Sequence, residues 1–119
     1  MSTVSWEDCE RKWLIQTMNI DRFSDVINRQ YRDNNNYNNI LEQAREARGS
    51  AITAWRKISD ANRDNSKEYA AKDSMNNAVS SMKELLTMFK HIPHMRDKEE
   101  VLQDIITSME LVIENTPHI

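Results

Sequence analysis

Glycine and proline are scarce in this sequence of 119 residues: glycine occurs once, at Gly49, and proline twice, at Pro93 and Pro117. Average usage would supply about eight glycines and six prolines in a chain of this length. The turns of β-sheets and the phosphate-binding loops of nucleotide enzymes depend on these residues. The scarcity therefore argues against β-sandwiches, Rossmann folds and P-loop enzymes, and it predicts an almost entirely helical protein.

Cysteine and long apolar runs are scarce as well. Cys9 is the single cysteine, which excludes an intramolecular disulfide and favours an intracellular, cytoplasmic setting. The first residues have neither a basic start nor an apolar core, so we expect no secretory signal. Apolar runs reach only two or three residues, so we expect no membrane-spanning segment.

Charge is nearly balanced overall but unevenly placed. The formal net charge of −3 is not that of a nucleic-acid packaging protein. Residues 22–63 carry eight basic and five acidic side chains, whereas residues 91–119 carry two basic and six acidic ones. This asymmetry suits antiparallel packing or head-to-tail assembly, although helices of one bundle can also simply differ in charge.

The apolar spacing before residue 34 predicts two helices, at 5–18 and 21–33. Ser5 is suited to cap the first helix. Asn19 and Asp21 resemble a break, with Asp21 capping the second helix. One uninterrupted helix is the alternative, because the apolar spacing continues across Asn19. This region could form an arm or part of the core.

A heptad pattern of apolar residues begins at Ile40 and is typical of a helix–helix contact. Its members are Ile40, Ala44, Ala47, Ala51, Ala54, Ile58 and Ala61. Four successive alanines predict a facing helix at close range. The same register reaches Phe89 after a polar, turn-like segment in which Ser66 is a plausible cap. We therefore expect an αα-hairpin of 37–62 and 66–90. One long coiled-coil-like helix, which would need a partner chain, is the alternative.

Pro93 ends this region, because proline disfavours helix in the preceding residue. Asp97 is expected to cap a last helix at 97–115, with Glu100 completing a capping box. That helix is strongly amphipathic. Its apolar arc comprises Val101, Leu102, Ile105, Ile106, Met109, Val112 and Ile113, and its acidic arc comprises Glu99, Glu100, Asp104, Glu110 and Glu114.

The predicted fold class is all-α: a bundle of four to five helices in a single domain, 1–119. It comprises the N-terminal helices of 1–33, a central αα-hairpin at 37–90 and the amphipathic C-terminal helix at 97–115.

Few residues suggest catalysis. Histidine occurs at His91, His94 and His118, and Pro93 spoils helical geometry between the first two. A metal site would need further ligands from another segment, and Glu84 or Asp97 could serve. No His-Glu-x-x-His or Glu-x-x-His pattern exists, however, so polar residues in a loop are the simpler interpretation. Cys9 has no evident histidine partner. We expect no enzymatic activity, no metal and no cofactor.

Two sets of residues are candidates for binding a protein partner. Trp55 and Ile52 lie beside Arg48 and Arg56, the composition of interface hot spots. A neighbouring helix of the same bundle could instead cover them. The second set lies on the C-terminal helix: Ile105, Met109 and Val112. The supply of large apolar residues exceeds what one small bundle readily buries, so we expect a homo-oligomer or a subunit of a complex.

Nucleic-acid binding is the alternative function. Arg45, Arg56 and Arg63 fall within about 20° of one another on a helix. Such a stripe can follow phosphates. Glu42 and Glu46 interrupt it, so a merely solvated helix face is the simpler interpretation. The sequence thus favours a non-enzymatic helical protein acting through protein–protein contacts, as a subunit, adaptor or inhibitor.

Overall fold

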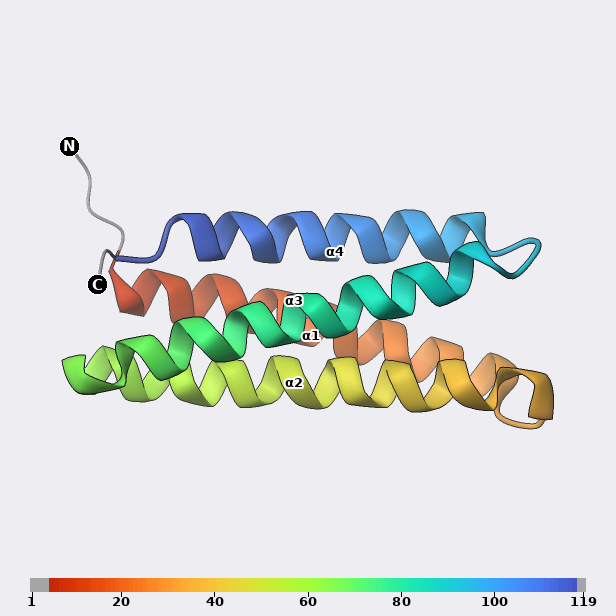
Figure 1. Ribbon diagram of the computed structural model, residues 1–119, viewed down its shortest axis with the longest axis horizontal. Coiled ribbons are helices and arrows are strands. Elements are labelled where there is room, and N and C mark those ends of the chain that lie inside the picture. Colours follow the sequence, from red (N-terminus) through yellow and green to blue (C-terminus); the bar gives the residue numbers. More distant parts are fainter. Residues whose placement is uncertain (1–4, 118–119) are drawn as a thin grey trace.

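The computed structural model describes residues 5–117, which form four α-helices packed as an antiparallel bundle (Figure 1). The helices are α1 (Trp6–Tyr31), α2 (Asn38–Arg63), α3 (Glu68–Lys90) and α4 (Arg96–Glu114). Helix accounts for 88% of the described residues and none of them is in a strand. The expected all-α bundle, with its central hairpin and amphipathic C-terminal helix, is confirmed. Each helix packs on the next, and α4 returns to α1 to close the ring.

The first helix, α1, runs without interruption, so the predicted break at Asn19 is wrong. Ile20 is fully buried and continues the apolar row that includes Trp13. The Asn19 side chain donates a hydrogen bond to Gln16 Oε1 at 3.2 Å, so it does not compete with the backbone of the helix. The Ser5 hydroxyl accepts from the Asp8 amide at 3.1 Å, which confirms the predicted N-cap. This helix packs on α2 and α4, so the region is part of the bundle rather than an arm.

The turns between α1 and α2 and between α2 and α3 each contain a short 3₁₀ helix, which is capped by an Asn or Asp side chain. The Asn34 side chain accepts from the Asn36 amide, and the Asp64 carboxylate accepts from the Ser66 amide, both at 3.0 Å. Asp64, not Ser66, is therefore the cap of the second turn, because the Ser66 hydroxyl is itself a donor to Asp64 at 2.8 Å. These hydrogen bonds hold the pKa of Asp64 below its ordinary value.

The third turn contains Pro93 and leads into α4. His94 has a φ of 67°, in the left-handed region, which reverses the chain direction. The helix begins at Arg96 with Met95 in the N-cap position, so the predicted capping box of Asp97 and Glu100 is wrong. Met95 is buried and its sulfur lies 3.4 Å from the Tyr31 hydroxyl. The start of α4 is therefore anchored in the core by Met95, whose side chain makes no hydrogen bond that caps the helix.

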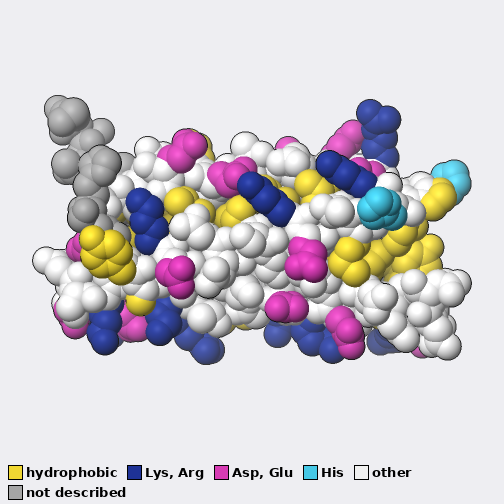
Figure 2. Space-filling model, viewed as in Figure 1, with side chains coloured by type: hydrophobic (Ala, Val, Ile, Leu, Met, Phe, Trp, Pro, Cys, Tyr) yellow, Lys and Arg dark blue, Asp and Glu magenta, His cyan; other side chains and the backbone are white. Residues whose placement is uncertain are grey.

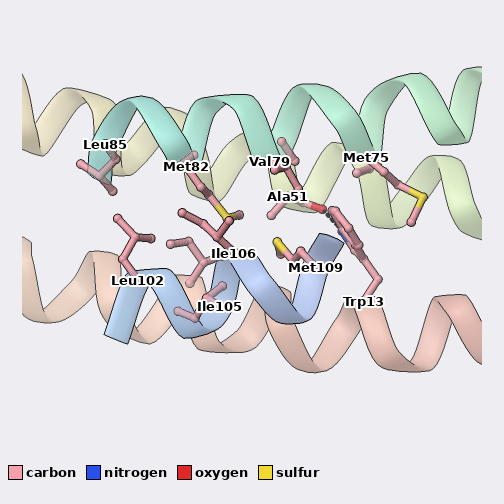
Figure 3. Close-up of a cluster of buried hydrophobic side chains, with 14 of the residues drawn as sticks. Trp13, Ala51, Met75, Val79, Met82, Leu85, Leu102, Ile105, Ile106 and Met109 are labelled. Atoms are coloured by element: carbon pink, nitrogen blue, oxygen red, sulfur yellow. Dashed lines mark hydrogen bonds between the residues drawn. The ribbon is translucent and has the colours of Figure 1, made fainter. Parts of the chain in front are cut away.

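The core is built around the row of small side chains on α2. All seven residues of the predicted heptad contact are buried, so that part of the prediction is confirmed. The indole N–H of Trp13 donates to the carbonyl oxygen of Ala51 at 2.9 Å (Figure 3). Alanine allows this, because a larger side chain would keep the indole away from the backbone. Larger residues from α3 and α4 fill the opposite half of the core: Met75, Val79, Met82, Leu85, Leu102, Ile105, Ile106 and Met109.

Candidate interaction surface

The sequence-predicted hot spot lies on the side of α2 that faces α1. Arg48 Nη1 lies 3.3 Å from Asp21 Oδ1 of α1, in an ion pair that links the two helices. Trp55 is half-buried and packs against the core, Ile52 is half-buried, and Arg56 is exposed. The bundle itself therefore supplies much of the cover for this cluster, which leaves little apolar surface for a partner.

The candidates on α4 are placed differently from the prediction. Ile105, Met109 and Val112 are buried within the bundle. Their apolar arc faces inward because α4 packs between α1 and α3. They are core residues in this fold and present no surface to a partner, which corrects that part of the predicted site.

The arginine stripe is fully displayed. Arg45, Arg56 and Arg63 are exposed on α2, and none of them forms an ion pair with another residue of 5–117. On the face that Figure 2 shows, Lys and Arg side chains gather along the lower edge, where α2 lies, with Asp and Glu between them. The surroundings of Arg45 are also mixed, because Asp21 and Asp25 line the same groove between α1 and α2.

Sequence reasoning missed a different surface, the seam between α1 and α4. Four aliphatic side chains are exposed along its two rims: Ile15 (56%), Val26 (48%), Val101 (50%) and Leu111 (57%). Ile15 and Leu111 line one groove of about 210 Å³. Val26 and Val101 line a second groove of about 480 Å³ further along. We call this surface the α1–α4 seam.

A signal for this seam exists in the sequence. Ile15 follows the buried Trp13 by two residues, and Leu111 follows the buried Met109 by two residues. A step of two residues on an α-helix is a rotation of about 200°, which points away from the core. An apolar residue at that step is therefore not required by the bundle and is a candidate for external contact.

Charged residues line the second groove of the seam between its apolar parts. Arg22 comes from α1, whereas Asp97 and Asp104 come from α4. Lys98 Nζ lies 3.1 Å from Asp97 Oδ2, and the pKa of Asp97 is lowered by that hydrogen bond. Arg22 and Asp104 form no ion pair with each other or with any other described residue. The seam thus combines exposed aliphatic groups with two unpaired charges of opposite sign.

The histidines and the cysteine considered for catalysis do not form a common site among the described residues. His91 and His94 are exposed at the α3–α4 turn, and His118 lies outside the described residues. Within residues 5–117, no three His, Cys, Asp or Glu side chains are gathered as ligands for a metal ion. Cys9 is buried, and burial raises the pKa of its thiol, which keeps it protonated and unreactive. None of the helices in the described part has the length and apolar character to cross a membrane.

Comparison with known proteins adds no assignment: no family model matches the chain, and neither a curated protein nor a solved structure matches it.

Proposed function

We propose that this chain is a non-enzymatic helical protein that acts through protein–protein contacts, as a subunit, adaptor or inhibitor, and that the α1–α4 seam is its contact surface. The observation that carries the proposal is the set of four exposed aliphatic side chains along one seam, Ile15, Val26, Val101 and Leu111. Apolar groups gathered in this way, with polar groups around them, are typical of interaction sites.

Two further features support the proposal. The two grooves of the seam lie between α1 and α4 and are lined from both helices, so a helix or a loop of another protein could contact both rims at once. The one thiol, Cys9, is buried and unreactive, which is consistent with a reducing, cytoplasmic setting and a structural role for that residue.

The test compares the wild-type chain with a seam variant, Ile15→Asp combined with Leu111→Asp. Both tagged chains are purified from the cells that make the protein, and the proteins that accompany each one are quantified, including untagged copies of the chain itself. Tyr69→Asp is the matched control, because Tyr69 is the most exposed large apolar residue away from the seam, at 71%. We expect a companion that the wild type and the control retain and that the seam variant loses. If the three chains retain the same set, the seam is not the contact surface.

A nucleic-acid-associated role is the second candidate, and it is favoured by the exposed side chains of Arg45, Arg56 and Arg63, which form no ion pair within residues 5–117. Any such binding should be weak and steeply salt-dependent, because it rests on phosphate contacts alone. Changing all three residues to Gln should abolish it and leave the fold intact. Fluorescence anisotropy with a labelled duplex, measured over a salt series, tests this. Tight binding that persists in the triple variant would exclude the stripe.

A further inference from the structure

We infer that the occupant of the α1–α4 seam is a second copy of this chain, in a two-fold dimer whose axis runs parallel to the helices. In that arrangement α1 of each copy lies against α4 of the other. The inference rests on the proposed function, because it names the partner of the same surface.

The positions of the exposed aliphatic side chains along the bundle axis, called their heights here, fit this two-fold symmetry. α1 and α4 run in opposite directions (Figure 1), and Ile15 shares a groove with Leu111, while Val26 shares the other groove with Val101. A half-turn about an axis parallel to the helices preserves height along the bundle and exchanges the two rims. Ile15 of one copy then meets Leu111 of the second copy, and Val26 meets Val101. The surface is self-complementary, as a two-fold interface requires.

The placement of charges favours this axis, parallel to the helices, over a two-fold axis perpendicular to them. The groove-lining charges on the α1 rim are Lys12 and Arg22. The α4 rim carries Asp97, Lys98 and Asp104, and because Lys98 pairs with Asp97, the charge left without a partner in the described chain is that of Asp104. The parallel axis brings Arg22 of one copy to Asp104 of the other, two charges that have no partner within the described chain. An axis perpendicular to the helices would place α1 on α1 and α4 on α4, so that like charges would face one another. Opposite charges at matching positions suppress wrong registers.

The seam is also large enough. The bundle measures 47 × 23 × 18 Å, and the seam follows its long axis. A stable interface buries about 800 Å² on each partner. A contact strip that runs along the whole 47 Å length of the bundle reaches this area even if it is narrower than the bundle itself. Two copies lying side by side can therefore bury enough surface for a stable dimer.

The first experiment is sedimentation velocity on the purified chain, from about 5 to about 500 µM, the range in which a modest interface dissociates. We expect a reversible monomer–dimer equilibrium. Ile15→Asp with Leu111→Asp should raise the dissociation constant at least tenfold, because it brings carboxylates into the apolar contact. Tyr69→Asp should leave it unchanged. A wild-type chain that is monomeric at every concentration overturns the inference.

The second experiment uses charge reversal and tests the axis. Arg22→Glu alone and Asp104→Arg alone should each weaken the dimer, because each apposes like charges in a symmetric pair. An equimolar mixture of the two variants should restore association, because both contacts across a mixed dimer are then attractive. If neither single change weakens the dimer, the rims do not meet in this way and the proposed axis is wrong.

The third experiment is disulfide trapping between two single variants, Ile15→Cys and Leu111→Cys. The mixture should form a cross-linked heterodimer under mild oxidation, and neither variant alone should do so efficiently. The native thiol does not interfere, because Cys9 is buried and burial raises its pKa. Efficient trapping of Ile15→Cys with itself would place α1 on α1 and overturn the geometry. If the purified chain stays monomeric while the seam retains a different protein, the inference fails and the proposed function stands.

Discussion

The α2–α3 pair and the α1–α4 pair are packed in opposite ways. The backbones of α2 and α3 approach closely along much of their length, whereas those of α1 and α4 do so far less. All eight alanines of the chain lie in α2 and α3, and neither α1 nor α4 contains one. Small side chains let helices approach, and large ones hold them apart. The size of the residues at each helix–helix contact therefore sets how closely the two helices approach, and the aliphatic groups that remain exposed to water lie along the less closely packed pair.

The largest effect on stability is expected at Met109, on the buried face of α4. Met109→Asp places a carboxylate where Met109 is fully buried, and it should lower the free energy of unfolding by about 3–5 kcal/mol or prevent folding. Denaturant unfolding followed by circular dichroism measures this. A variant that folds with near wild-type stability would mean that α4 does not bury this arc in solution.

A smaller loss of stability is expected in the close contact of α2 with α3. Ala47→Leu adds volume where Ala47 is fully buried, and overpacking of this kind costs about 1–3 kcal/mol. Ala70→Leu is the matched control, because Ala70 is exposed on α3 and the same change should be nearly neutral there. Thermal and denaturant melts of both variants give the difference. Equal stabilities would contradict the close packing of the alanine row.

A gain in stability is expected at the one glycine. Gly49 lies in α2, is exposed, and a β-carbon added there would meet nothing within 4 Å. Gly49→Ala should stabilise the chain by about 0.5–1 kcal/mol, because it reduces the entropy of the unfolded chain without a clash. The midpoint of urea unfolding should rise while the slope stays constant. A lower midpoint would show that a β-carbon at position 49 meets a neighbouring group in solution.

The smallest effect is expected at the open seam. Leu111→Asp changes an exposed residue only two positions from Met109, and its effect on unfolding should stay within about 0.5 kcal/mol at low protein concentration. The measurement uses the same denaturant series as Met109→Asp. A loss comparable with that of Met109→Asp would show that Leu111 is buried in solution and that α1 and α4 pack as tightly as α2 and α3.

Much of this fold follows from local chemistry. The scarcity of glycine and proline, the heptad spacing from Ile40 and the position of Pro93 are sufficient to predict the class, the hairpin and the end of α3. Three local signals were misleading. Asn19 and Asp21 are polar enough to suggest a break, but burial of Ile20 keeps the helix intact. At the second site, Asp64 accepts the hydrogen bond expected of Ser66. At the third, Met95 occupies the N-cap position in place of Asp97 and makes no side-chain hydrogen bond there, because it is buried in the core.

The site was harder to predict than the fold. A helical wheel tells which residues share a face, but it does not tell which helix covers that face. Trp55 and Met109 are both candidates for a partner contact by sequence, but in the bundle Met109 is fully buried and Trp55 is half-buried against the core. Ile15 and Leu111 can be recognised as candidates for external contact only when the buried face of each helix is known, because both are apolar residues that lie outside that face.

The order of helices around the bundle has a kinetic consequence. Three of the four packing contacts join helices that follow one another in the chain through short turns, and the fourth joins α1 to α4, the two ends of the chain. Contacts between sequence neighbours form early, because little chain entropy is lost in closing a short loop. The α1–α4 contact closes a far longer loop and is also the more loosely packed one, so we expect it to form last and to open first. Amide hydrogens along α4 should therefore exchange through a partial opening well before those of α2.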